Sequence, residues 1–184
     1  MMHIYSSKIK DVYIVENYCD NDERGFFLRL FCQEELGDVL SHRVIQQINH
    51  SCTLHVGAIR GFHFQNPPYA EMKLIRCIKG RVWDVVLDLR KGSATFLQWY
   101  AEELSADNSK MIVIPEGCAH AFQVLDANSE LLYLHTNFYK PEAEGGVHVL
   151  DPYLSIDWPL PVKDLSSRDK AHPFIDGSFS GIEL

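Results

Sequence analysis

The chain has 184 residues, which is enough for one domain with a sizeable core and too few for two. A hydrophobic content of 46% is ordinary for a globular protein, and a formal net charge of −8 argues against non-specific binding of nucleic acid. No apolar run approaches the ~18–20 residues that span a bilayer, and the first residues lack the apolar stretch of a signal peptide. We therefore expect a single domain over 1–184, with no nucleic-acid or membrane partner.

Short strands dominate the predicted secondary structure. Alternation of apolar and polar residues predicts a strand over 11–17, a turn cluster follows, and a second strand is expected over 25–31. A short helix is predicted over 33–40 and another near 166–170. Between them, strands are expected over 43–50, 57–65, 71–79, 81–89, 95–103, 111–115, 120–125 and 130–139. So many strands without long helices predict an all-β sandwich or barrel.

Two local predictions concern the strand over 81–89. The break at Lys79 and Gly80 leaves little room between two long strands, which favours a tight hairpin there. Along the strand, one face carries two aspartates and two valines. The opposite face, which is expected to form the core, carries Trp83, Val85, Leu87 and Leu89.

The cysteines indicate a reduced compartment. Five are scattered through the chain without CxxC spacing, which argues against a zinc ribbon or a thioredoxin-type motif. Four lie in apolar stretches, where a free cysteine usually packs as a small hydrophobic residue. These features predict a cytoplasmic protein.

The segment Arg-Gly-Phe-His-Phe-Gln at 60–65 carries the first candidate for chemistry. Strand alternation places the two phenylalanines on one face and Gly61, His63 and Gln65 on the other. One face can pack while the other presents an imidazole. The same alternation puts Arg60 on the phenylalanine face, so either Gly61 marks a bulge or Arg60 reaches around from the start of the strand.

Nine histidines in a predicted barrel raise the alternative of a metal site. The run Pro-Glu-Gly-Cys-Ala-His at 115–120 resembles the second motif of the cupin barrel, but the first motif is broken because Gln65 stands where a second ligand histidine is needed. Only His63, His120 and Glu71 could contribute, whereas metal sites need several converging donors. No metal is therefore expected.

Acid–base chemistry next to a ketone fits the residues better. It requires a base with a near-neutral pKa, a stabiliser for the enolate oxygen and an acid on the opposite face. His63 can be the base, and Lys73 shares the inward parity of Ile75 and Cys77. A phenol can return the proton, and parity places Tyr133 and Tyr139 on one face.

Nearly the whole chain resembles the dTDP-4-dehydrorhamnose 3,5-epimerase family. The matching segments keep the family's spacing and are 22–27 (DERGFF), 47–51 (QINHS), 60–65 (RGFHFQ), 73–76 (KLIR), 80–90 (GRVWDVVLDLR), 93–96 (SATF), 104–108 (LSADN), 114–122 (IPEGCAHAF) and 151–159 (DPYLSIDWP). The resemblance implies a cupin-type jelly-roll barrel with N-terminal strands for dimerisation and short C-terminal helical segments. It also implies a homodimer without metal or cofactor that epimerises a nucleotide-linked 4-keto-6-deoxyhexose at C3, C5 or both. Such an enzyme serves deoxysugar biosynthesis for a surface polysaccharide or a similar glycan.

The resemblance also assigns roles to individual residues. His63 is implied as the base with Asp169 as its partner, Tyr133 as the acid and Lys73 as the enolate stabiliser. Arg60 and His120 are implied to line the sugar and pyrophosphate site. The full set of implied substrate contacts, some of which the family borrows across its dimer, is Arg24, Phe27, Arg29, Gln47, Asn49, Arg60, His120 and Tyr139.

Several positions depart from the family pattern. Arg29 stands where the family usually has Glu, which makes another base, such as cytosine, an alternative to thymine. Leu134 replaces a Lys and Phe138 a Tyr, and an expected Arg is missing at Gly145, so a single inversion at C3 or C5 is a further alternative. A nucleotide-sugar 3,4-ketoisomerase and a non-catalytic cupin sugar-binding protein are also open alternatives. We expect the remaining histidines of interest to lie at the surface, namely His3, His42, His148 and His172.

Overall fold

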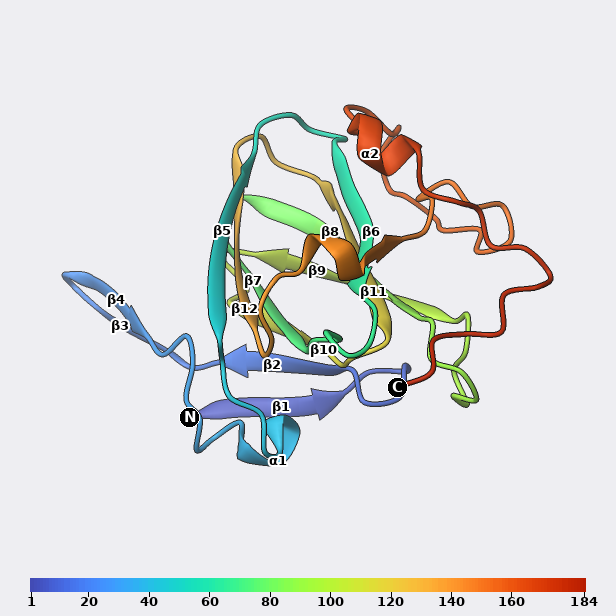
Figure 1. Cartoon of the computed structure of the whole chain (residues 1–184). Coiled ribbons are helices and arrows are strands. Elements are labelled where there is room, and N and C mark those ends of the chain that lie inside the picture. The colour runs from blue at the N-terminus through green and yellow to red at the C-terminus, as the bar shows by residue number, and fades with distance from the viewer.

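The computed structural model describes residues 1–184 and consists almost entirely of strands arranged in two facing sheets (Figure 1). One sheet has six antiparallel strands in the order β1 (Met2–Ser6), β2 (Tyr13–Asn17), β10 (Lys110–Ile114), β7 (Lys73–Lys79), β12 (Ser129–His135) and β5 (Gln47–Thr53). The other has five in the order β13 (Glu144–Gly146), β6 (Ile59–Gln65), β11 (Cys118–Val124), β8 (Arg81–Asp88) and β9 (Trp99–Ser105). The predicted all-β jelly-roll barrel is confirmed.

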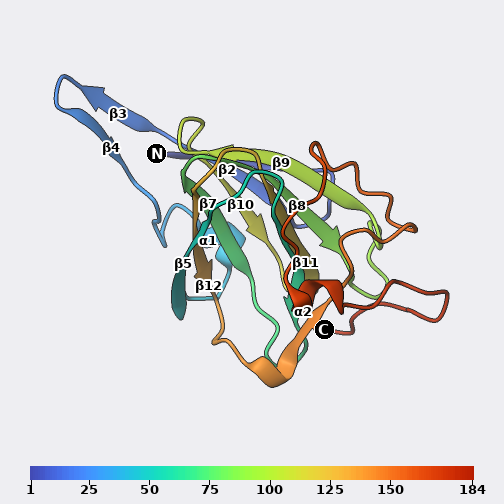
Figure 2. The same ribbon diagram turned by 90° about the horizontal axis from the view of Figure 1, so that it is seen from above.

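A hairpin, two short helices and a 3-10 turn lie outside the two sheets. A hairpin of β3 (Cys19–Asp22) and β4 (Gly25–Leu28) projects away from the barrel in both views (Figures 1 and 2). The helix α1 (Gly37–Leu40) packs beside β1, and the helix α2 (Ser167–Lys170) lies near β6. A 3-10 turn at Pro141–Ala143 connects β12 to β13. No helix of this chain has the length and apolar character that a membrane crossing requires.

The core is divided among three clusters because both sheets are covered on their outer faces. The barrel interior is filled from both sheets by side chains such as Ile75 and Ile112 on one wall and Val86 and Phe122 on the other. The C-terminal segment covers the outer face of the five-stranded sheet, where Phe62 packs against Trp158 with ring centroids 6.3 Å apart. The segment containing α1 covers the outer face of the six-stranded sheet with Leu36 and Leu40. Full burial of each such side chain stabilises the fold by roughly 1.5–3 kcal/mol.

Of the two predictions about β8, the hairpin is wrong and the core face is confirmed. The break at Gly80 is not a hairpin, because β7 and β8 belong to different sheets and the residue, with φ +73°, turns the chain from one sheet to the other. Both faces of β8 are buried. Val85 and Leu87 pack under the C-terminal segment as expected, whereas Val82 and Val86 line the barrel interior.

Other differences occur where elements end. The helix expected over 33–40 begins only at Gly37, and the strand expected over 25–31 ends at Leu28. The strand expected over 130–139 ends at His135, after which the chain leaves the sheet toward the 3-10 turn. Fewer cysteines are buried than expected: Cys77 and Cys118 are buried, whereas Cys52 is exposed on the edge strand β5.

Candidate active site

A cavity of about 960 Å³ opens between the two sheets, a volume suited to a small-molecule ligand. Strands β5, β6, β7, β11 and β12 and the α2 segment contribute its walls. The structure brings into this one cavity most of the side chains that the sequence singled out, namely Asn49, Arg60, His63, Lys73, His120, Tyr133, Tyr139 and Asp169.

A bulge in β6 explains how Arg60 reaches the same cavity as His63. His63 lies opposite His120 on β11, whereas Arg60 lies opposite Phe122, so β6 carries one more residue than its partner between these two pairs. Gly61 sits in this bulge with φ +122°, and a Cβ there would lie 2.4 Å from the carbonyl oxygen of His120. The bulge puts Arg60 on the cavity face, where its Nε donates to the hydroxyl of Thr53 at 2.9 Å.

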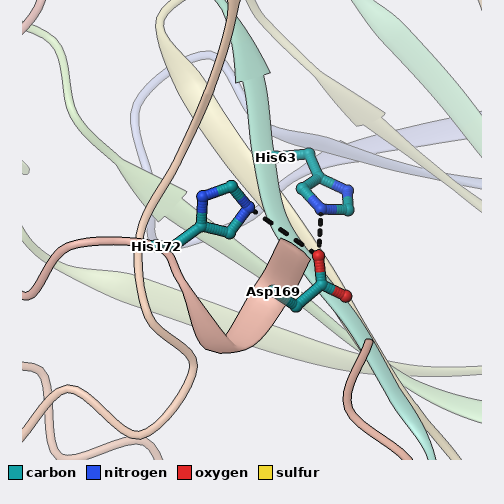
Figure 3. A group of neighbouring side chains, drawn as sticks. All are labelled: His63, Asp169 and His172. Carbon is teal, nitrogen blue, oxygen red and sulfur yellow. Dashed lines mark hydrogen bonds and ion pairs between the residues drawn. The ribbon is translucent and has the colours of Figure 1, made fainter. Parts of the chain in front are cut away.

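His63 and Asp169 form a hydrogen-bonded pair at one wall of the cavity. Nε2 of His63 lies 2.7 Å from Oδ1 of Asp169, whose side chain is buried (Figure 3). Ser166 caps α2 by accepting from the backbone N–H of Asp169 at 3.0 Å, which fixes the start of the helix that carries the carboxylate. Burial alone would raise the pKa of Asp169, but the hydrogen bond and charge of His63 outweigh it and lower that pKa. An ionised carboxylate therefore holds the Nε2 proton, which leaves Nδ1 of His63 free to accept one.

His172 lies beside this pair, contrary to the expectation that it is a surface residue. Its Nε2 is 3.7 Å from the same oxygen of Asp169, and the two imidazole rings meet edge to face at 5.5 Å (Figure 3). Burial and the neighbouring His63 lower the pKa of His172. The residue sits three positions after Asp169, one helical turn away, and this spacing is the signal that could have placed it here.

These three side chains also have the composition of a metal-ligand set, with their ligand atoms within 4.8 Å of one another. However, His63 Nε2 and Asp169 Oδ1 are 2.7 Å apart. Two ligands of a tetrahedral ion with bonds of ~2.0–2.2 Å lie roughly 3.3 Å or more apart. The guanidinium of Arg168, 3.7 Å from Asp169, would also repel a cation. The geometry fits a hydrogen-bonded dyad better than a metal centre.

Tyr133 and His120 occupy the deep part of the cavity. The Tyr133 hydroxyl lies 3.2 Å from the hydroxyl of Ser51, and burial raises its pKa, so the phenol keeps its proton at neutral pH. His120 packs edge to face against Tyr133 with ring centroids 6.2 Å apart. Its Nε2 lies 2.8 Å from Asp84, a fully buried carboxyl whose pKa is raised by burial.

Lys73 pairs with Glu71, which the sequence indicated only as a possible metal ligand, and Glu71 in turn contacts His135, which the sequence did not single out. Nζ of Lys73 lies 3.1 Å from Oε1 of Glu71, and the second carboxylate oxygen of Glu71 lies 3.0 Å from Nδ1 of His135. All three side chains are buried and line the cavity. Burial would raise the pKa of Glu71, but the hydrogen bond from His135 and the charge of Lys73 outweigh it and lower that pKa. Glu71 and Lys73 share a parity, as do Tyr133 and His135, so the same alternation could have found both.

The remaining predicted contacts lie outside this chain's own cavity. Arg24 and Phe27 are on the projecting β3–β4 hairpin, where Phe27 is 74% exposed and Arg24 pairs with Asp22. Arg29 follows β4 and pairs with Glu35. Gln47 is at the start of β5 and accepts from the backbone N–H of Tyr139 at 3.1 Å.

The cavity therefore combines an imidazole with an ionised carboxylate behind it, a protonated phenol and an ammonium group. His63 comes from the five-stranded sheet, and Tyr133 comes from the six-stranded sheet opposite. A base and an acid on opposite walls, with a positive charge beside them, can remove a proton next to a carbonyl and return one to the other face.

Comparison with known proteins gives consistent matches. A family model described as dTDP-4-dehydrorhamnose 3,5-epimerase matches residues 6–176. The dTDP-4-dehydrorhamnose 3,5-epimerase of Salmonella typhimurium is 40% identical over 178 residues, covering 96% of this chain and 97% of that protein. The crystal structure of dTDP-6-deoxy-D-glucose-3,5-epimerase from Legionella pneumophila, in complex with dTDP-4-keto-L-rhamnose, superposes with a TM-score of 0.91 at 37% identity over 100% of both chains. ChmJ, a 3'-monoepimerase from Streptomyces bikiniensis, has a TM-score of 0.87 at 31% identity, covering 92% of this chain and 86% of that one.

Proposed function

This chain belongs to the dTDP-4-dehydrorhamnose 3,5-epimerase family, and we propose that it is an isomerase that inverts a nucleotide-linked 4-keto-6-deoxyhexose at a carbon next to the ketone. The observation that carries the proposal is the His63–Asp169 pair on one wall of the cavity, with Tyr133 on the other and Lys73 between the same two sheets. We propose that residues 1–184 act as one domain.

The proposed reaction needs only proton transfers. Nδ1 of His63 removes the proton from the carbon next to the C4 ketone, the electron pair of the broken C–H bond forms a double bond to C4, and the π electrons of the ketone move onto its oxygen. Asp169 stabilises the imidazolium that forms. Lys73 places its positive charge against the enolate oxygen. Tyr133 then delivers a proton to the opposite face of the carbon, the ketone re-forms and the configuration is inverted.

The carbon that is inverted is C3, C5 or both. The relatives include 3,5-epimerases and a 3'-monoepimerase, so the family performs both double and single inversion. In this chain Leu134 and Phe138 stand near Tyr133 where the family pattern has a Lys and a Tyr, which favours a single inversion in a deoxysugar pathway. The nucleotide part of the proposed substrate is a nucleoside diphosphate. Arg60, in the β6 bulge, can donate two hydrogen bonds to it at once.

The projecting β3–β4 hairpin supports a homodimer. Phe26 and Phe27 are 73% and 74% exposed on it, and Ile48 is 60% exposed on the edge strand β5. Docking against a second copy would bury these side chains and bring Arg24, Phe27 and Arg29 to the partner's cavity. Sedimentation should give twice the chain mass, and a monomer would contradict this assembly. We also propose a cytoplasmic location, which the absence of any disulfide among the cysteines favours.

Hydrogen exchange with solvent tests the proposed function. Incubated in D2O with a 4-keto-6-deoxyhexose linked to thymidine or cytidine diphosphate, the protein should incorporate deuterium at C3, at C5 or at both, as read by NMR of the sugar. His63→Ala should lower the exchange rate by about 10²–10⁴-fold, because the proposed base is removed. Absence of label with every nucleotide tried would contradict the proposal, and a carbonyl moved to C3 would indicate a ketoisomerase instead.

Tyr133 separates proton removal from inversion. Tyr133→Phe should slow inversion more than exchange, because His63 can still remove and return a proton on its own face. The measurement compares deuterium uptake with the appearance of the inverted product in the same sample. Equal losses in both would show that Tyr133 is not the acid.

A further inference from the structure

Glu71 joins Lys73 to a longer chain of hydrogen bonds. The polar side chains Glu71 and His135 are 6% and 9% exposed, and the bridging carboxylate uses one oxygen for each neighbour. His135 Nε2 lies 3.4 Å from the amide nitrogen of Asn49, and the amide oxygen of Asn49 accepts from Gln47 at 3.2 Å. The chain therefore runs from β5 to the proposed enolate stabiliser.

The direction of every hydrogen bond in this chain is fixed from one end. The backbone N–H of Tyr139 can only donate, and it donates to the amide oxygen of Gln47 at 3.1 Å. The amide nitrogen of Gln47 therefore donates to Asn49, whose own amide nitrogen donates to Nε2 of His135. Nε2 is then an acceptor, so the proton of a neutral His135 lies on Nδ1, where it is donated to Glu71 at 3.0 Å.

At the other end, the chain fixes the ammonium group of Lys73. Nζ lies 3.1 Å from Glu71 and donates to the carbonyl oxygen of His63 at 3.4 Å. An ammonium group has three N–H donors, so two are held by the protein and one remains for a substrate oxygen. The group is thus oriented as well as charged.

We propose that Glu71 and His135 are positioning residues for Lys73, and that the chain they complete links the lysine to Asn49 and Gln47 on β5. The inference rests on the proposed function, because it concerns the geometry of the group that stabilises the enolate. It assigns a role to two side chains that hydrogen-bond to neither the base nor the acid, although the His135 ring also stacks on Tyr133 with ring centroids 6.1 Å apart. It also makes β5, which carries the predicted substrate contacts Gln47 and Asn49, part of the support of Lys73.

Glu71→Gln breaks the chain at constant volume. Lys73 and His135 meet different oxygens of Glu71, and in an amide one of these two positions is a donor nitrogen, so one of the two contacts is lost. A change of tautomer at His135 relieves the conflict at Nδ1 but moves it to the other nitrogen, because Nε2–H would then face the amide nitrogen of Asn49. Glu130→Gln is the matched control, since Glu130 bridges Lys79 and His50 at 2.9 Å each and does not itself line the cavity.

The first measurement is steady-state deuterium exchange with the nucleotide sugar. Glu71→Gln should lower kcat by about 10–100-fold, or ~1.4–2.7 kcal/mol of barrier, and leave KM within about threefold. Glu130→Gln should stay within about twofold of wild type in both. If the wild type exchanges and Glu71→Gln exchanges at the same rate, the inference is overturned while the proposed function stands. An inactive wild type would contradict the proposed function, and this inference with it.

The second measurement does not depend on turnover. Long-range ¹H–¹⁵N NMR of the full chain reads the tautomer of each histidine, and His135 should carry its proton on Nδ1 in wild type and in Glu130→Gln. Glu71→Gln should shift His135 away from that tautomer. A wild-type His135 with its proton on Nε2 would overturn the chain, whatever the rates.

Discussion

A cluster of one Glu, one Lys and one His lies at each end of β7, and one cluster is buried whereas the other is largely exposed. At the start of the strand, Glu71 lies between Lys73 and His135, and the three side chains are 6–10% exposed. At its end, Glu130 lies between Lys79 and His50, whose side chains are 61% and 52% exposed. In both clusters a carboxylate uses one oxygen for the lysine and the other for the histidine.

The difference shows that burial, and not the set of contacts, decides what such a cluster does. In water, an exposed ion pair gains little because solvent and salt screen its charges. In the cavity, the charges are strong because few waters compete, and each donor must find its acceptor. The buried cluster can therefore orient a charge for chemistry, whereas the exposed one holds two strands loosely together.

The largest expected effect is a difference in deuterium exchange rate between variants of the two lysines. Lys73→Met should lower the deuterium exchange rate by about 10²–10³-fold, because the positive charge against the enolate oxygen is lost. Lys79→Met should leave the rate within about twofold of wild type. Both rates are measured at saturating nucleotide sugar. Equal rates for the two variants would remove Lys73 from the reaction.

The two glutamates should differ in stability. Glu71→Ala leaves a buried ammonium without its carboxylate and should lower the free energy of unfolding by about 3–5 kcal/mol. Glu130→Ala should leave the urea midpoint almost unchanged, because water replaces the carboxylate. Urea unfolding followed by tryptophan fluorescence gives both values. A midpoint shift as large for Glu130→Ala as for Glu71→Ala would contradict the comparison.

Much of the fold follows from strand alternation, which predicts the all-β class and most strands. Alternation does not say which strands share a sheet, and this is why a hairpin was wrongly expected at Gly80. It also does not say that a second layer will cover a sheet. The C-terminal segment buries the outer face of β8, so a strand expected to have one core face has two.

The site is predictable only in part, for a similar reason. Parity and resemblance select His63, Lys73 and Tyr133, which the structure places in one cavity, while their roles stay predictions. Glu71 was considered only as a metal ligand and His135 was missed, because only the sheet pairing of β7 with β12 brings them together beside Lys73. The hairpin residues, such as Arg24, lie outside this chain's cavity, so their predicted contacts depend on the proposed homodimer.

Acid titration gives the smallest and most specific contrast between the clusters. The folded-state pKa of Glu71 is lowered, because His135 and Lys73 together outweigh the effect of burial. A carboxylate of this kind stabilises the fold above its unfolded pKa of ~4.3, and that contribution is lost as the pH falls through the lower folded value. Glu71→Gln has no such proton to bind, so its stability deficit relative to wild type should shrink as the pH is lowered from 6 toward 3. The deficit of Glu130→Gln should be small throughout, since water already solvates that carboxylate. Unfolding free energies measured with urea across this pH range test whether the deficit shrinks or grows. A Glu71→Gln deficit that grows on acidification would mean that Glu71 is protonated in the folded protein. The buried cluster would then carry no ion pair.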